Sequence, residues 1–175
     1  MANPFGDAAA AAGMTAEQVA TLLDQRGLGD VGTFTVATLP DLTTAARRTA
    51  WVTDLYSDQP TPGGRVVSEG GFWKPIRPLA TAGVSLTGNV VLTPLLHSPT
   101  QILKGTVGAG LTRTVNYSTT NAYPGAKFRS VNRMTLGALA VMSIVGTVIP
   151  FGSWADHEYD PSTNTWVQTA SGGLL

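Results

Sequence analysis

The strongest constraint on the fold is a series of short alternating segments from Asn89 to the end of the chain, interrupted by turn residues. The interruptions fall about every 8–12 residues, a spacing typical of sandwiches and small barrels. The chain has 20 glycines and 11 prolines, and only 13% of its residues are charged. This composition suits short strands joined by turns and does not suit a helical bundle. We therefore predict an all-β fold whose main body is an antiparallel, jelly-roll-like β-sandwich.

This main body is expected over residues 81–175. The segment "LATAGVSLTG" (residues 79–88) should form a connector, and turn signals such as Ser98-Pro99, Gly108-Ala-Gly110 and Gly146 separate the strands that follow. The expected strands span residues 89–95, 100–107, 111–118, 126–133, 135–145, 147–151, 153–160 and 165–170.

A small β unit is expected over residues 34–80, where it would serve for attachment. "FTVATL" from Phe34 alternates and predicts a strand, as does "TAWVTDLY". "RVVSEGGFWKPI" predicts a hairpin turning at Gly70-Gly71. Trp73 and Trp166 each open the return strand of a hairpin, which favours packing over sugar binding.

Residues 1–33 are expected to form an arm with one short helix. Thr15 and Gln18 have the spacing of a capping box, and Gly27 is suited to end a helix over Ala16–Arg26. A helix of this length is marginal alone in water, so it should lie against the body or another subunit.

The chain has no cysteine, which excludes disulfides, thiolate metal sites and cysteine catalysis. No secretory signal is apparent at the N-terminus. The uncharged run from Met134 to Trp154 is long enough for a membrane helix, but Gly146 and Pro150 interrupt it. We expect two buried strands meeting near Gly146 instead, and no membrane partner.

Charge is distributed in three blocks. Residues 1–70 have a net charge of −4, residues 71–155 carry seven bases and no acid, and residues 156–175 carry three acids and no base. On the strand 126–133, Lys127, Arg129 and Arg133 share the face opposite Phe128, so we predict that they face a partner. Alternatively, the three blocks interleave in space and their charges mix. No exposed aromatic interleaves with these bases, so nucleic acid is not the expected partner.

The best acidic cluster is Asp156, Glu158 and Asp160, which a strand would place on one face. We expect a solvated face with Ala155 and Tyr159 pointing inward. A cation site and a glycoside-cleaving pair are the alternatives. His97 and His157 have no metal-ligand spacing, and no nucleophile motif or phosphate loop is present, so neither an enzyme nor a cofactor is expected.

The motifs "LTPL", "LTRTV", "GAKFR", "WADHEYD" and a closing "WV" strand occur in this order in the main body. In this order they resemble a module of tailed-bacteriophage appendage proteins. The stretch "VATLPDLTTAARRTAWVTDLYSDQPTPGGRVVSEGGFWKPI" is also similar to a short motif of phage tail and fibre proteins. The resemblance covers about 120 residues. The segment "TLGALAVMSIVGTVIPF" departs from the module because it is more apolar, which suggests a buried subunit interface.

The resemblance implies a structural, non-enzymatic virion protein, commonly trimeric, with no catalytic residue to carry over. The chain would be a short head fibre, capsid decoration or appendage that contacts capsid or tail proteins of the virion. A tail-fibre module that binds a host receptor or surface glycans is the alternative. A carboxylate-dependent glycan hydrolase and a membrane-anchored protein are the remaining alternatives.

Overall fold

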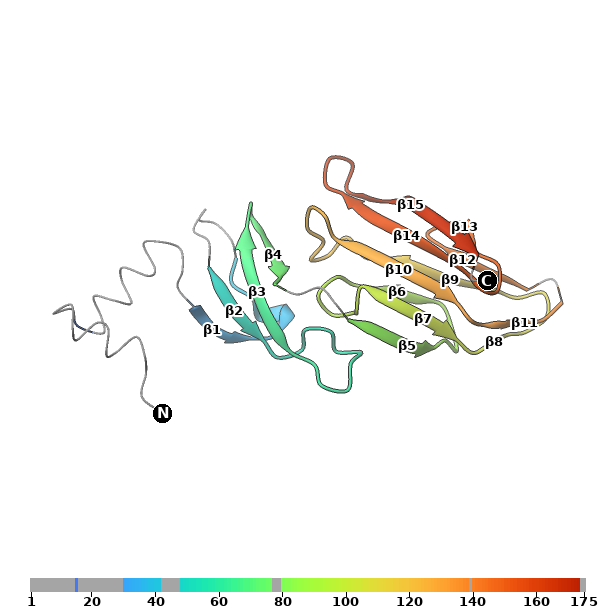
Figure 1. The fold of residues 1–175 in the computed structure, drawn as a ribbon, viewed down its shortest axis with the longest axis horizontal. Coiled ribbons are helices and arrows are strands. Elements are labelled where there is room, and N and C mark those ends of the chain that lie inside the picture. The colour runs from blue at the N-terminus through green and yellow to red at the C-terminus, as the bar shows by residue number, and fades with distance from the viewer. Residues whose placement is uncertain (1–14, 16–29, 42–47, 77–79, 139, 174–175) are drawn as a thin grey trace.

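The computed structural model describes residues 15, 30–41, 48–76, 80–138 and 140–173, which form fifteen strands and one 3-10 turn (Figure 1). The first unit contains β1 (Asp30–Phe34), the 3-10 turn η1 (Val36–Thr38), β2 (Thr49–Val52), β3 (Gly64–Glu69) and β4 (Phe72–Pro75). The main body contains β5 (Thr81–Ser85), β6 (Val90–Leu92), β7 (Thr100–Lys104), β8 (Thr106–Val107), β9 (Thr112–Tyr117), β10 (Lys127–Asn132), β11 (Thr135–Leu136), β12 (Val141–Ile144), β13 (Thr147–Val148), β14 (Ser153–Asp160) and β15 (Thr165–Gly173).

The first unit is a four-stranded sheet in the order β1-β2-β3-β4. β1 runs parallel to β2, and the other neighbours are antiparallel. Gly70 and Gly71 both have positive φ (60° and 81°), as the tight turn between β3 and β4 requires. Ala50, Val52 and Val66 are fully buried on one face, so alternation along β2 and β3 creates the core side of this sheet.

The main body is wound as three stacked coils rather than as antiparallel hairpins. β5 and β6 form the first coil, β7 to β9 the second, and β10 to β12 the third. Corresponding strands pair in parallel: β5 with β7 and β7 with β10, β6 with β9 and β9 with β12, and β8 with β11. Two parallel neighbouring strands must be joined by a long connection. In this body the other strands of each coil form that connection.

Antiparallel strands complete the two main sheets. β13 returns alongside β12 through Val145 and Gly146, which both have positive φ (47° and 82°). β14 pairs with β10, and β15 pairs with β14 along its length. The result is a five-stranded sheet, β15-β14-β10-β7-β5, facing a four-stranded sheet, β13-β12-β9-β6.

The core of the body lies between these two sheets. Leu103 and Met142 are among its fully buried apolar side chains, and an aromatic group fills one region. The Tyr117 ring lies 4.7 Å from that of Phe128 and 5.3 Å from that of Trp166, and Trp166 lies 5.6 Å from its cross-strand neighbour Tyr159. These contacts confirm a packing role for Trp166.

Asp58, in the loop after β2, joins the first unit to the body. Its carboxylate accepts hydrogen bonds from the backbone N–H of Ser98 at 2.9 Å and from the Ser98 hydroxyl at 2.6 Å. It also accepts one from the Gln101 side-chain amide at 2.7 Å. Ser98 and Gln101 are fully buried, so these bonds compensate for the removal of polar groups from water.

Backbone and apolar contacts extend this junction. The N–H groups of Tyr56 and Ser57 donate to the carbonyls of Leu95 and Leu96 at 2.7 and 2.8 Å. Leu95 is buried in the same cluster as Val36 and Leu55 of the first unit. One apolar core therefore crosses the boundary between the two units.

The predicted all-β fold is confirmed, and so are most strand positions and both tryptophan hairpins. The expectation of a wholly antiparallel body was wrong, because period-two alternation does not encode the direction of the neighbouring strand. The connector expected over residues 79–88 contains the strand β5. "FTVATL" forms η1 instead of a strand, where the Thr35 and Thr38 side chains cap the turn in a reciprocal pair.

Two further expectations need separate comment. The hairpin near Gly146 is confirmed, but β13 is exposed rather than buried. The helix expected over Ala16–Arg26 lies outside the described residues, while β1 begins at Asp30, inside the range assigned to the arm. Among the residues that the structure describes, no helix has the length and hydropathy needed to cross a membrane.

We predict that Asp58→Ala lowers the free energy of unfolding by about 3 kcal/mol, because buried donors on Ser98 and Gln101 would lose a charged acceptor. Urea denaturation of the purified chain measures this change. Glu69→Ala is the control, since its exposed ion pair with Lys74 at 3.4 Å should contribute less than about 1 kcal/mol. Equal losses in the two variants would contradict the role assigned to Asp58.

Candidate functional site

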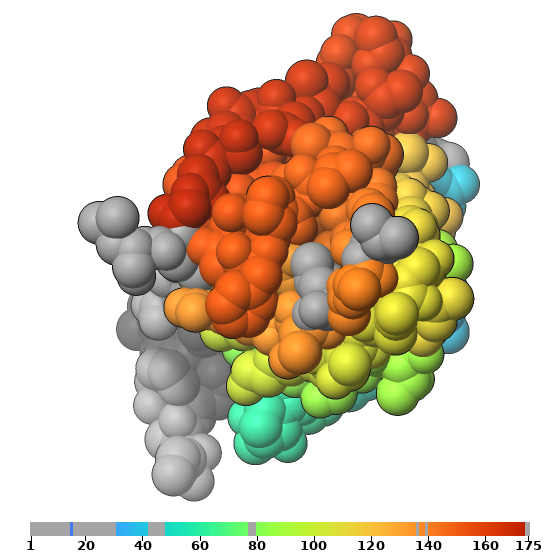
Figure 2. Space-filling view, turned by 90° about the vertical axis from the view of Figure 1, so that its right-hand side faces the viewer, coloured from blue at the N-terminus to red at the C-terminus, as the bar shows by residue number. Residues whose placement is uncertain are grey.

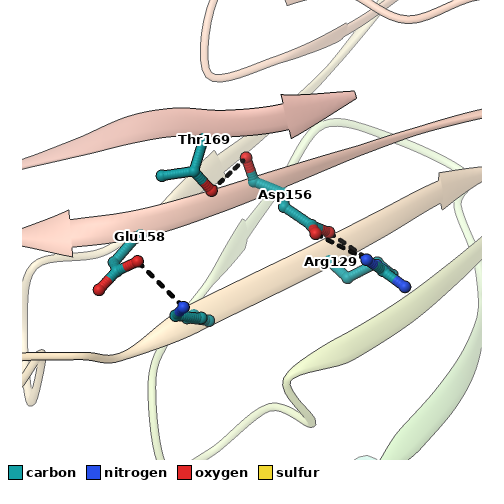
Figure 3. Close-up of polar contacts among 5 residues, drawn as sticks. Arg129, Asp156, Glu158 and Thr169 are labelled. Atoms are coloured by element: carbon teal, nitrogen blue, oxygen red, sulfur yellow. Dashed lines mark hydrogen bonds and ion pairs between the residues drawn. The ribbon is translucent and has the colours of Figure 1, made fainter. Parts of the chain in front are cut away.

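The predicted basic residues lie on the outward face of the five-stranded sheet, beside the acidic residues of β14. Figure 3 shows Arg129 turned toward Asp156 on the neighbouring strand. The antiparallel register places Lys127 opposite Glu158 and Arg129 opposite Asp156. This face, defined by Lys104, Lys127, Arg129, Arg133, Asp156 and Glu158, is called the charged face below.

Arg129 is the most firmly held cation of the charged face. Its Nε and one terminal nitrogen each donate to a different carboxylate oxygen of Asp156 at 2.7 Å, a bidentate arrangement. This hydrogen bonding raises the pKa of the guanidinium above its ordinary value. The guanidinium also lies over the Trp154 ring, 4.5 Å from its centroid. Lys127 pairs with Glu158 at 3.1 Å; the lysine side chain is exposed and the glutamate side chain is partly exposed.

Two basic residues of this face have no such partner. Lys104 and Arg133 are exposed, and neither forms an ion pair with an acid among the described residues. The Arg133 N–H donates to the carbonyl of Leu103 at 2.8 Å, which places these two cations at the same end of neighbouring parallel strands. Of the three residues predicted to face a partner, Arg133 is therefore the one with an unneutralised charge.

The two other predicted residues, Lys127 and Arg129, are paired across the sheet with the acids of the C-terminal block. The alternative in which the charge blocks interleave is thus correct for these two positions. Whether any of the three contacts a partner stays a prediction.

The acidic residues of β14 lie on the outward face, as expected, while Ala155 and Tyr159 are buried on the other side. Asp160 is used in the following turn, where it accepts hydrogen bonds from the hydroxyl of Ser162 at 2.6 Å and that of Thr163 at 2.9 Å. The bonds from Ser162, then that from Thr163, lower the pKa of this carboxyl. Within the described ranges, no group of three or more acidic or histidine side chains is arranged to hold a metal ion.

The two histidines have structural surroundings. His97 Nδ1 accepts the backbone N–H of Thr93 at 2.9 Å. His157 is 1% exposed, its ring lies 5.2 Å from that of Tyr117, and its Nδ1 has no hydrogen-bond partner. Burial lowers the pKa of His157, while the nearby Asp156 acts weakly in the opposite direction.

The outward face of the four-stranded sheet carries no charged side chain among its described strand residues. Register and burial alternation place Val91, Thr112, Thr114, Asn116, Val141, Ser143 and Val148 on this uncharged face. Val91 and Val148 are 55% and 60% exposed, and exposed Leu111 and Phe151 lie at the ends of neighbouring strands. Figure 2 shows the end of the body far from the first unit, where the orange part of the chain, which includes the β12–β13 region, is at the surface.

A groove of about 920 Å³ lies where the first unit meets the body. The first unit contributes residues around η1 and at the start of β4, including Leu39, Asp41, Phe72 and Trp73. The body contributes the loop after β9 (Ser118 to Ala122) together with Thr93, Leu95, Leu96 and Tyr159. Trp73 donates its indole N–H to the Pro40 carbonyl at 2.9 Å, which confirms its structural contact but leaves the ring in the groove wall.

Sequence reasoning missed several of these residues. Lys104 was overlooked because the parallel pairing of β7 with β10, which places it beside Arg133, was not expected. The alternating Thr112, Thr114 and Asn116 of β9 were a usable signal for the uncharged face. The groove had no local signal, because its walls are separated by many residues along the chain.

Known proteins show little similarity to this chain. No family model matches the chain, and no curated protein matches it. A chain in a solved structure of a chaperone–substrate complex is 15% identical, with a TM-score of 0.37. The match covers 81% of the present chain and 28% of the other chain, so the present chain spans little more than a quarter of that length. Similarity at this level carries no argument about fold or function.

We predict that Arg129→Glu lowers the free energy of unfolding by about 1–2 kcal/mol, because it replaces the bidentate pair by two carboxylates on opposing strands. Arg133→Glu is the matched control and should change stability by less than about 0.5 kcal/mol, since no ion pair is lost. Denaturant titrations in low salt and in high salt measure both variants, and screening should reduce the effect of Arg129→Glu. No difference between the two would contradict the structural role of Arg129.

We also predict a pH dependence of stability that arises from His157. Because its folded pKa lies below the ordinary 6.5, the unfolded chain binds the proton first as the pH falls. Stability from this group is therefore fully present above about pH 7 and decreases below about pH 6.5, until the folded pKa is reached, by at most about 1.4 kcal/mol per pH unit. Urea titrations at pH 7.5 and 5.5 should show a smaller decrease in His157→Phe than in the unmodified chain, and equal decreases would exclude His157 as the cause.

Proposed function

We propose that the protein is a non-enzymatic structural protein of a tailed-phage virion, a short head fibre, capsid decoration or similar appendage. It attaches through its N-terminal region and projects a trimeric β body. The resemblance of the sequence to phage appendage modules supports the class of particle, and the uncharged face supports assembly with further copies of this chain.

The observation that carries the proposal is the contrast between the two outward faces. The charged face has its central cations matched by carboxylates on the next strand. The uncharged face instead exposes valines among threonine, serine and asparagine side chains. Burial of these valines in a contact with another subunit would remove apolar area from water.

An uncharged face is well suited to a cyclic trimer. In such an assembly, residues of this face that line the three-fold axis come from all three subunits, so a charge there would be repeated and would repel its copies. Hydroxyl and amide groups beside apolar ones can pair across an interface without that cost. The apolar segment "TLGALAVMSIVGTVIPF", which departs from the phage module, supplies Val141, Ser143 and Val148 of this face.

Attachment to the particle is assigned to the arm and first unit, with Lys104 and Arg133 as additional contacts to an acidic surface. Their lack of acidic partners within the described ranges leaves two charges for such a contact. The alternative function, a module that binds a receptor or carbohydrate, is favoured by one separate observation, the groove beside Trp73.

We predict that the purified full chain sediments as a trimer and that Val148→Lys shifts it to monomer. The substitution would place a charge on an exposed valine at the uncharged face, where burial in an interface would remove the charge from water. Analytical ultracentrifugation at several protein concentrations measures the mass.

Val167→Lys is the matched control. Val167 is 48% exposed on β15 and pairs with Glu158, so a lysine is accommodated there without loss of fold. The control should remain trimeric. A monomeric unmodified chain, or a Val148→Lys trimer of unchanged stability, would contradict the assigned interface.

A further inference from the structure

The groove between the two units has one apolar and one polar wall. Trp73 of β4 and Leu39 form the apolar wall, and both are half-buried. The hydrogen bond from the Trp73 indole N–H to Pro40 fixes the orientation of the ring without any ligand. Aromatic rings held in this way present a flat apolar surface at little cost in conformational entropy.

The opposite wall is the loop after β9, which carries exposed Thr119, Thr120 and Asn121. Its backbone is held by hydrogen bonds from the Thr120 N–H to the Ser118 hydroxyl at 3.0 Å and from the Ala122 N–H to the Thr119 carbonyl at 3.1 Å. Asn121 has a positive φ of 58° at the tip of this loop. The side chains of these three residues have no hydrogen-bond partner among the described residues, so their hydroxyl and amide groups are available.

The charged side chains that line the groove limit the classes of ligand that it can bind. Its lining includes two acids, Asp41 and Asp54, and no lysine or arginine. Asp54 accepts the Val36 N–H at 2.7 Å, whereas Asp41 is exposed and forms no ion pair within the described ranges. Phosphate, sulfate and carboxylate groups would meet only like charge there. A neutral ligand with many hydroxyl groups can instead donate to the carboxylate of Asp41.

We propose that this groove binds a short neutral oligosaccharide, which stacks its apolar ring face on Trp73 and bonds its hydroxyl groups to Asp41, Thr119 and Asn121. The groove volume of about 920 Å³ lies within the range of ligand sites. The aromatic wall and the ordered loop are both present before the ligand arrives, which reduces the entropy lost on binding. This site does not depend on the trimer or on attachment to a particle.

The test uses the full chain with lactose, maltotriose, cellotriose and diacetylchitobiose as probes. Saturation-transfer NMR and calorimetry measure binding, and sialyllactose serves as the charged counterpart of lactose. We expect saturable binding of at least one neutral probe and no tighter binding of sialyllactose than of lactose. Absence of binding to all four neutral probes, or preferential binding of sialyllactose, overturns the proposal.

Variants then locate the site. Thr119→Ala combined with Asn121→Gly removes two polar groups, and glycine keeps the positive φ of the loop tip. This variant should bind the neutral probe at least tenfold more weakly. Thr106→Ala combined with Gln168→Ala changes exposed residues outside the groove and should bind the probe as the unmodified chain does. Equal affinity in the two double variants overturns the assignment to the groove.

The sedimentation mass separates this proposal from the proposed function. The groove variants should keep the mass of the unmodified chain, because none of their residues lies on the uncharged face. A trimer without saccharide binding would overturn the groove proposal alone. A monomer that binds saccharide would overturn the trimer alone.

Discussion

The hydrogen bonds of the Asp58 carboxylate hold the two halves of the molecule in one arrangement. The loop that carries Asp58 also places Leu55 and Tyr56 in the shared apolar core, and the Asp58 carboxylate satisfies buried donors on Ser98 and Gln101 of the body. The apolar cluster around Leu95 buries contact area between the two units, but apolar contacts are not directional. The three hydrogen bonds to the Asp58 carboxylate are directional, so they fix how one unit is oriented against the other. The groove depends on this junction, because its two walls belong to different units.

The parallel stacking of the coils determines which charged side chains become neighbours. In a parallel stack, residues at equivalent positions of successive coils become neighbours, so Lys104 and Arg133 lie together although 28 residues separate them. β14 then lies antiparallel to β10 and brings its carboxylates to Lys127 and Arg129. At one end of the charged face Lys127 and Arg129 are thus neutralised by carboxylates, whereas Lys104 and Arg133 at the other end have no acidic partner among the described residues.

In both sheets of the body, successive side chains alternate between the core and the outer surface, but the outward residues of the two sheets differ in character. Their inward residues form one core, including the aromatic group around Tyr117 and the buried His157. Their outward residues differ, since one sheet carries paired ions and the other carries valine, threonine and serine. Paired ions keep a surface solvated, whereas small uncharged side chains lose little on leaving water, so the second sheet is the better candidate for contact with other subunits.

The amino-acid sequence by itself determined the all-β class, most strand positions, the Gly70-Gly71 hairpin and the side of β14 that faces the core, because period-two alternation and turn residues act over a few neighbouring residues. It did not determine the parallel winding, the strand β5, the pairing of Arg129 with Asp156, or the groove. Alternation sets which face a side chain occupies, but not which strand lies beside it or in which direction that strand runs. Those neighbours follow from long-range packing of the coils against one another, and only the tertiary structure decides them.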